Sequence, residues 1–297
     1  MPPSSFTIRH PSLDLELCLK PIEELKLHEE TIEALLEKLK REIEVDHVLK
    51  HPVIVDRNTL IVLDGMHRVE ALRVLGYGYV PVCLVNYESP AITLGSWARL
   101  ILNLQSLKPL ISMLLSFRYV VVECRSFDEV KGALVSREAS LGVITNQQLL
   151  LVKTGFKDIK RIYEVLKRVE SELEARGYTI SYETERDAYD KVKGLKAPVA
   201  LIPPTALKSE VISTALRGER FPHKTTRHII PARPLFINVP LKWLTSSLNL
   251  KEAATHFYNH LRRKTVIHHP PGQVLDRRYE EETYVFQNSA RSNTERT

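Results

Sequence analysis

Residues 52–78, PVIVDRNTLIVLDGMHRVEALRVLGYG, contain the pattern that decides the fold of the first part of this chain. Two short runs rich in β-branched residues, PVIVD and TLIVLD, are separated by Arg57 and Asn58, which predicts a hairpin of two strands. Residues 66–78 then read as a helix that stops at a glycine. Gly65 allows the backbone to turn tightly between the second strand and this helix.

The segments on either side of residues 52–78 complete a first mixed unit. Residues 13–25 alternate as a strand does, residues 28–44 have helical spacing, and residues 80–87 read as a further strand. The middle of the chain also mixes strands and helices, including a long amphipathic helix over residues 158–177. The sequence therefore predicts an α/β (α+β mixed) fold with two such units.

The expected boundaries follow from these segments. We predict a first domain over residues 1–105 and a second α/β domain over residues 106–245, which includes a polar, basic loop at residues 222–231. Residues 246–297 form an extension, and from residue 264 onward they are charged and poor in apolar side chains. We expect this tail to be weakly ordered, at least in part.

Composition narrows the class of protein. The chain has 297 residues, of which 43% are hydrophobic and 26% are charged with mixed signs, which is enough for a sizeable core. Its net charge of +6 favours anionic partners without separating nucleic acids from nucleotide phosphates. Three cysteines occur without a CxxC pair, as suits a reducing compartment. The first residues lack a signal-peptide pattern and no apolar run could span a membrane, so we expect a cytoplasmic protein.

Residues 64–68, DGMHR, carry the sharpest chemical signal. Backbone amides at the start of a helix point toward any anion, and His67 and Arg68 add side-chain donors there. Asp64, at the end of the strand, could accept a proton or hold a cation. These residues fit a phosphate cradle, and they fit equally a capped helix with a basic face.

Two further groups are candidates for ligand binding. The loop PHKTTRH at residues 222–228 gathers cationic and hydroxyl side chains, and its Arg227 could clamp a carboxylate or phosphate with two hydrogen bonds. Glu29 at the predicted start of the first long helix could accept the proton of a reacting hydroxyl. Taken singly, an exposed basic loop and a glutamate that satisfies a helix dipole explain these patterns at least as well.

Together these motifs resemble the free L-serine kinase family of archaea, which is built on a ParB/sulfiredoxin-like domain. The resemblance rests on His28-Glu29, on DGMHR at residues 64–68, and on KTTRHIIP at residues 224–231 followed by FINV at residues 236–239. It covers roughly residues 13–244. It implies a ParB/sulfiredoxin-like nucleotide-binding domain followed by a second α/β domain.

The resemblance also implies the roles of individual residues. Glu29 and Asp64 match catalytic carboxylates, and Asp64 is in addition the candidate metal ligand. The phosphate cradle comprises Gly65, Met66, His67 and Arg68, and the substrate-binding residues are Ser96, Trp97, Thr225, Thr226, Arg227 and His228. Met66 replaces the first histidine of the family motif, so its backbone amide can face a phosphate but the imidazole is missing.

The function implied by the resemblance is phosphoryl transfer from ADP or ATP, with Mg²⁺, to free L-serine. The product, O-phospho-L-serine, would feed cysteine biosynthesis. The chain has no Walker A pattern, so it is not a P-loop kinase. The alternative is a ParB-like DNA-binding or nuclease-like protein, but neither a basic helix-turn-helix region nor a cluster of metal-binding carboxylates is evident, which makes nucleic acid a weak candidate partner. Sulfiredoxin chemistry is excluded because Met66 stands where that chemistry needs a cysteine.

Overall fold

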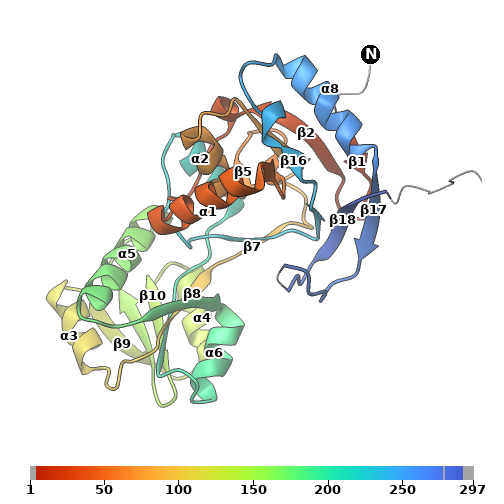
Figure 1. The fold of residues 1–297 in the computed structure, drawn as a ribbon. Helices are drawn as coiled ribbons and strands as arrows, with labels where there is room; N and C mark the ends of the chain where they lie inside the picture. The colour runs from red at the N-terminus through yellow and green to blue at the C-terminus, as the bar shows by residue number, and fades with distance from the viewer. Residues whose placement is uncertain (1–4, 277, 290–297) are drawn as a thin grey trace, which may run out of the picture. The chain divides into compact units, whose positions relative to one another are not determined.

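The computed structural model describes residues 5–276 and 278–289, and it divides the chain into two compact units (Figure 1). Unit 1 consists of Met1–Thr93, Ala215–Gly218 and His228–Thr297, and unit 2 consists of Leu94–Thr214 and Glu219–Arg227. The chain therefore passes between the units several times. Each unit builds its own sheet and core.

Unit 1 is organised around a five-stranded mixed sheet in the order β1–β2–β6–β4–β5. Its strands are β1 (Phe6–Ile8), β2 (Leu15–Pro21), β6 (Tyr79–Val85), β4 (Val53–Asp56) and β5 (Val62–Asp64). The β4–β6 pair is parallel and the other pairs are antiparallel. The predicted hairpin is the antiparallel pair β4–β5, and its apolar side chains are buried because they point into the core of this unit.

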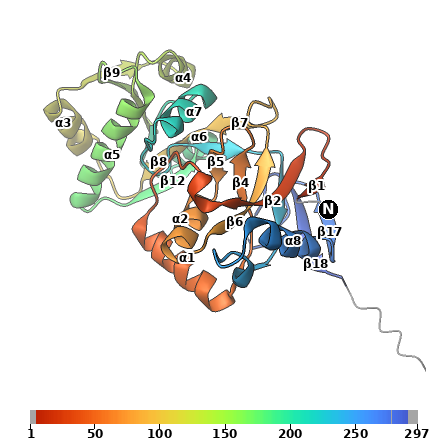
Figure 2. The same cartoon turned by 90° about the horizontal axis from the view of Figure 1, so that it is seen from above.

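Helices α1 (Glu33–Asp46) and α2 (Met66–Val74) pack against each other in unit 1, side by side in Figures 1 and 2. α2 lies within the predicted helix of residues 66–78 and buries Val69, Ala71 and Leu72. α1 begins at Glu33, so residues 28–30 lie in the segment that precedes the helix rather than in its first turn. This segment is fixed by hydrogen bonds to other parts of unit 1.

The C-terminal part of the chain is built into unit 1. β3 (Val48–Leu49) pairs with β16 (Val239–Pro240), and helix α8 (Leu250–Leu261) packs on β2 (Figure 2). A three-stranded sheet has the order β15 (Ala232–Leu235), β18 (Glu282–Asn288), β17 (Lys264–His269). The sequence predicted weak order from residue 264 onward, and this is wrong for the described residues up to 289. Although few of their side chains are apolar, strand β18 is held by hydrogen bonds to β15, and β17 is held by hydrogen bonds to β18. Residues 290–297 lie outside the described part.

Unit 2 is a six-stranded antiparallel sheet in the order β12–β8–β13–β10–β11–β9. The strands are β12 (Ile180–Thr184), β8 (Trp97–Ile101), β13 (Val199–Ile202), β10 (Leu141–Thr145), β11 (Leu149–Lys153) and β9 (Val120–Cys124). Its helices are α3 (Lys108–Ser116), α4 (Phe127–Val135), α5 (Ile159–Ala175) and α6 (Glu185–Lys193), while α7 (Lys208–Leu216) crosses the unit boundary. Asp158 caps α5, the long amphipathic helix that the sequence predicts, and the inward stripe of that helix is buried.

The units differ from the expected boundaries of 1–105, 106–245 and 246–297. β8, which was expected in the first domain, pairs with β12 and β13 and so belongs to unit 2. The chain returns to unit 1 at His228, within the predicted loop at 222–231. The short strands β7 (Thr93–Gly95) and β14 (Arg227–Ile229) pair with each other. The boundaries depend on which distant segments pair as strands. Local composition does not show this pairing, so the sequence could not predict the boundaries.

Two expectations about the whole chain can be checked in the described residues. Among them, no helix is long and apolar enough to cross a membrane. The three cysteines are free and buried, and burial raises the pKa of the Cys18 thiol to about 12 and raises that of Cys83 further. Because these thiols are buried and stay protonated, they are poor nucleophiles. Their role is to pack as small apolar side chains.

A buried ion pair in unit 2 gives a test of this fold. Arg99 on β8 is 1% exposed, pairs with Glu170 on α5, and donates hydrogen bonds to the carbonyl oxygens of Trp97 and Lys224. We expect Glu170→Ala to lower the free energy of unfolding of unit 2 by about 3–5 kcal/mol, because it leaves a buried guanidinium without its counter-charge.

Urea unfolding can follow this loss through Trp97 fluorescence in a Trp243→Phe background, since these are the two tryptophans of the chain. The matched control is Glu172→Ala on the same helix, which removes an exposed pair with Arg176 and should cost less than about 1 kcal/mol. Equal losses in the two variants would contradict the structural role of the buried pair.

Candidate functional site

The turn between β5 and α2 is formed by residues 64–68 and depends on Gly65. Its φ of +98° lies in a region that L side chains rarely adopt, and a Cβ placed there would lie 2.7 Å from Arg68 Nη2. The carbonyl of Gly65 accepts hydrogen bonds from the amides of Arg68 and Val69, so the helical ladder starts at this residue. The amides of the first turn therefore point out of the N-terminal end of α2, as a phosphate cradle requires.

Asp64 at the end of β5 is held by two guanidinium groups. Its Oδ2 accepts hydrogen bonds from Arg68 Nη2 at 2.9 Å and from Arg233 Nη1 at 2.7 Å. Arg68 Nη1 also donates to the carbonyl of Pro52 at 2.6 Å. The carboxylate thus fixes the direction of the Arg68 side chain across the turn.

Arg233 on β15 and Glu281 just before β18 were not among the residues singled out from the sequence. Arg233 is 9% exposed and forms ion pairs with both Asp64 and Glu281. Burial by itself lowers the pKa of Arg233, but the two carboxylates outweigh it and raise the pKa above the ordinary value. The signal that could have found it is an arginine inside the apolar segment that follows the basic loop, because a buried arginine needs a charged partner.

His28 and Glu29 lie in the segment before α1. The Nδ1 of His28 donates a hydrogen bond of 2.8 Å to the carbonyl of Val62 on β5, and burial lowers the pKa of His28 to about 4. His28 is therefore neutral at pH 7, so its Nε2, 3.9 Å from Glu29 Oε1, does not form an ion pair with that carboxylate. Glu29 is buried, with 6% of its surface exposed.

His67 connects this segment to the turn. Its Nε2 accepts a hydrogen bond of 2.9 Å from the backbone N–H of Ile32, the residue that precedes α1. An imidazole nitrogen that accepts is unprotonated, so Nδ1 carries the hydrogen in the neutral ring and can donate to an anion. One side chain of the predicted cradle thus caps the helix that follows Glu29.

Of the predicted substrate-binding residues, His228 lies in unit 1. Its Nε2 shares a hydrogen bond of 2.9 Å with the hydroxyl of Tyr87, and its ring lies 5.2 Å from that of His28. Burial raises the pKa of Tyr87, so this hydroxyl stays protonated. Unit 1 therefore brings His28, Glu29, residues 64–68 and His228 into one connected set, to which Tyr87 is an addition that the sequence did not reveal.

The other predicted substrate-binding residues lie in unit 2. Trp97 Nε1 donates to the carbonyl of Thr226 at 3.1 Å, and the cationic groups of Lys224 and Arg227 lie 4.7 Å and 5.8 Å from its ring centre. This arrangement presents a tryptophan beside two cations, which suits a small anionic ligand.

Two of the predicted hydroxyls are used inside unit 2. Thr225 is fully buried, and its hydroxyl donates to the carbonyl of Pro222 at 2.7 Å. Ser96 is also buried and donates a long hydrogen bond, 3.4 Å, to the carbonyl of Pro203. Both side chains therefore shape the loop and its strand, and the groups of unit 2 best suited to meet a ligand are Trp97 and Arg227.

Mg²⁺ was expected with the nucleotide, and Asp64 was its candidate ligand. Among residues 5–276 and 278–289, no group of three or more His, Cys, Asp or Glu side chains could hold a metal ion. The Oδ2 of Asp64 is already shared by two guanidinium groups. The donor set does not form a protein cage, but it is compatible with a Mg²⁺ that is bound mainly by substrate phosphates.

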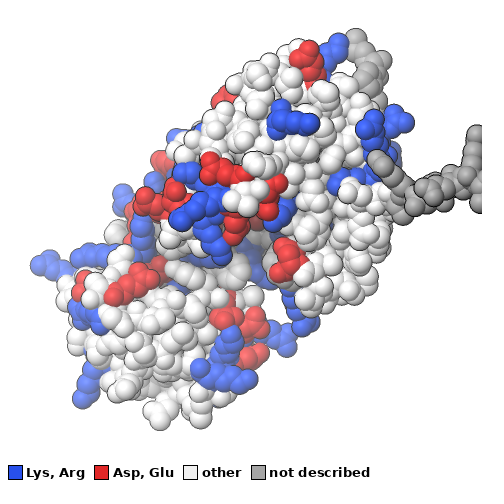
Figure 3. Space-filling view, in the orientation of Figure 1, with Lys and Arg blue, Asp and Glu red and all other residues white. Residues whose placement is uncertain are grey.

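The exposed charges do not form a basic surface of the kind that binds DNA on the face shown in Figure 3. Lys and Arg side chains are intermixed there with Asp and Glu. Unit 2 is built on an antiparallel sheet where a ParB-like DNA-binding protein would need a helix-turn-helix. These observations do not favour the nucleic-acid alternative.

No family model matches the chain. It is 27% identical to an ATP-dependent L-serine kinase of Staphylothermus marinus over 81% of this chain and 94% of that protein. It is 22% identical to the ADP-dependent L-serine kinase SerK of Thermococcus kodakarensis over 79% and 95% of the two chains. A solved structure of a free serine kinase mutant in complex with ADP matches with a TM-score of 0.65, at 20% identity, over 77% of this chain and 93% of that one.

These comparisons confirm the resemblance to the free L-serine kinases and the mixed α/β fold that it implied. The relatives are covered almost completely while about a fifth of this chain has no counterpart in them. The roles of the individual residues are not tested by the comparisons and stay predictions.

The position of His28 generates a pH-dependent prediction. Its pKa is about 4 in the folded chain and about 6.5 when unfolded, so the unfolded chain takes up the proton first as the pH falls. Stability should therefore decrease between about pH 6.5 and pH 4, with this histidine contributing about 3 kcal/mol over the whole window. His28→Asn keeps a donor for the carbonyl of Val62 but cannot titrate.

Urea unfolding of the original chain and of His28→Asn at pH 7 and pH 4.5 measures this contribution. The variant should lose less stability on acidification than the original chain, and the exposed His47→Asn should behave like the original chain. If His28→Asn and the original chain lose the same amount, His28 is not buried in its neutral form.

Proposed function

We propose that this chain is an L-serine kinase, a phosphotransferase that transfers the terminal phosphoryl group of a nucleotide to the hydroxyl of free L-serine. The observation that carries the proposal is the attachment of the Glu29 segment to the phosphate turn. His28 bonds to the strand that ends in Asp64, and Ile32 bonds to His67 of the turn itself. A buried carboxylate and an anion cradle are thus held in one unit, and the relatives named L-serine kinases span most of the chain.

In the proposed reaction the serine hydroxyl oxygen attacks the terminal phosphorus of the nucleotide. The new P–O bond forms as the bond to the bridging oxygen breaks, and the shortened nucleotide leaves with that oxygen. Glu29 accepts the hydroxyl proton, which gives O-phospho-L-serine and a protonated carboxyl that later returns its proton to water. A carboxylate that is 6% exposed is well suited to this step because water competes little for it.

The residues of the turn neutralise the phosphates. The first amides of α2 and the side chains of His67 and Arg68 face the anion, and the backbone amide of Met66 takes part although the imidazole of the related kinases is missing. Asp64 keeps Arg68 in position and is in turn held by Arg233. Phosphoryl transfer depends mainly on such positioning and charge neutralisation.

We assign the binding of serine to Ser96, Trp97, Thr225, Thr226, Arg227 and His228. Arg227 is suited to the substrate carboxylate because its guanidinium can donate two parallel hydrogen bonds. Thr225 and Ser96 act through the shape of the loop, since their hydroxyls bond to backbone carbonyls.

The donor is ATP or ADP, and Mg²⁺ would enter with its phosphates, where it supplies charge neutralisation. The product would serve cysteine biosynthesis, and the reaction would take place in the cytoplasm. The three free, buried cysteines agree with a reducing compartment.

Glu29→Gln tests the proton acceptor. With serine, Mg²⁺ and either ATP or ADP, we expect the original chain to form O-phospho-L-serine, detected by ³¹P NMR, and the variant to lose about 10²- to 10⁴-fold in kcat. Nucleotide affinity should stay within threefold, because the amide preserves the shape of the side chain. Glu30→Gln, one residue along the same segment, is the matched control and should keep kcat within threefold. Retained turnover in Glu29→Gln would exclude Glu29 as the base.

Arg233 is proposed as a positioning residue that acts through Asp64. Arg233→Gln should reduce kcat 10- to 100-fold and also destabilise unit 1 by about 3 kcal/mol, because Glu281 loses its partner. The double variant Arg233→Gln/Glu281→Gln should regain much of the stability while kcat stays low and KM for serine stays within threefold. Recovery of kcat together with stability would show that Arg233 has only a structural role.

A further inference from the structure

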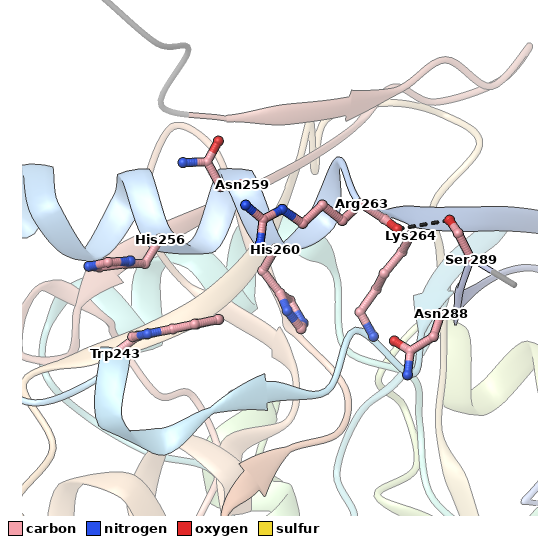
Figure 4. A pocket seen from close by; sticks show the side chains of 8 residues that line it. All are labelled: Trp243, His256, Asn259, His260, Arg263, Lys264, Asn288 and Ser289. Atoms are coloured by element: carbon pink, nitrogen blue, oxygen red, sulfur yellow. Dashed lines mark hydrogen bonds between the residues drawn. The ribbon is translucent and has the colours of Figure 1, made fainter. Parts of the chain in front are cut away.

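A pocket lies in unit 1, in the part of the chain that follows residue 242 (Figure 4). Its volume is about 500 Å³, which is within the usual range for small-molecule sites. It is lined by Trp243, His256, Asn259, His260, Arg263, Lys264, Asn288 and Ser289. None of these residues belongs to the set assigned to phosphoryl transfer.

One wall of this pocket is aromatic and ordered by ring contacts. The ring of His256 on α8 stacks on Trp243 with a centroid distance of 5.7 Å and an interplanar angle of 7°. His260, one helical turn further, meets Trp243 edge-on at 5.3 Å and shares a hydrogen bond of 2.7 Å with the carbonyl of Ile237. Figure 4 shows both imidazoles beside the Trp243 ring.

The charges at the pocket are all positive. Arg263 lies between the C-cap of α8 and β17, Lys264 is the first residue of β17, and the residues that line the pocket include no carboxylate. Within the described part of the chain, neither Arg263 nor Lys264 has an acidic side chain within ion-pair distance. Burial lowers the pKa of His260, and the nearby Lys264 and Arg263 lower it further. Cations gathered on a pocket without a counter-ion repel one another, and a bound anion would relieve that repulsion.

We propose that this pocket is a binding site for a small anion with two or more negative charges, carried by phosphate or carboxylate groups. Arg263 and Lys264 supply the charge, Asn259 and Asn288 supply neutral hydrogen-bond partners, and the Trp243 wall limits the size of the ligand. Ser289 shapes the rim, because its hydroxyl donates to the backbone carbonyl of Arg263 at 2.8 Å. Apart from Trp243, the lining residues lie beyond residue 244, where the resemblance to serine kinases ends, so the ligand would be an effector rather than a substrate. The site does not depend on the proposed kinase activity.

Trp243 offers a direct report of binding. In a Trp97→Phe background it is the only tryptophan, so its fluorescence can be followed while pyrophosphate or citrate is added at constant ionic strength. We expect a saturable change with at least one of these anions. Pyrophosphate alone would identify a phosphate site, citrate alone a carboxylate site, and both a site for either group.

Variants of neighbouring arginines separate a specific site from general attraction by a basic protein. Arg263→Ala and Lys264→Gln should each raise the Kd at least fivefold, whereas Arg262→Ala, which removes the same charge beside the pocket without lining it, should change the Kd less than twofold. Circular dichroism checks that the variants are folded. The absence of any saturable change, or equal effects of Arg262→Ala and Arg263→Ala, would overturn the proposal.

Discussion

The carboxylate of Asp64, shared by Arg68 and Arg233, is the interaction on which the arrangement of unit 1 depends. It ties the consecutive elements β5 and α2 to β15, which lies far from them in the sequence. The cost of burying the Arg233 guanidinium is offset because a second carboxylate, Glu281, approaches it from the C-terminal segment. The same cluster keeps the guanidinium of Arg68 over Gly65, next to the helix terminus that would receive a phosphate.

The C-terminal segment consequently has a structural role at the site. Its strand β18 pairs with β15, the strand that carries Arg233. Glu281 is the residue immediately before β18. The relatives are covered almost completely by about four fifths of this chain. The pocket beside Trp243, with the cations Arg263 and Lys264, is lined mainly by residues of this segment.

Neutral histidines perform much of the positioning in unit 1. His28 donates to the backbone of β5 and His67 accepts from the backbone before α1, so two imidazoles fix the segment of Glu29 without adding charge. The low pKa of His28 keeps this arrangement intact at pH 7, because burial disfavours the protonated form of the ring.

The sequence by itself determined the local features: the β4–β5 hairpin, the turn at Gly65, the amphipathic helix α5 and the three motifs of the serine kinases. These follow from periodicity and from backbone conformations that only particular residues adopt, and both are written in consecutive positions. Only the tertiary structure decided the rest. The assignment of β8 to unit 2, the ordered strands β17 and β18, and the roles of Arg233, Glu281 and Tyr87 depend on pairing across long separations. The residues near a charged side chain or a strand in the sequence do not indicate which distant group will pair with it. Such partners can be identified only in the folded chain.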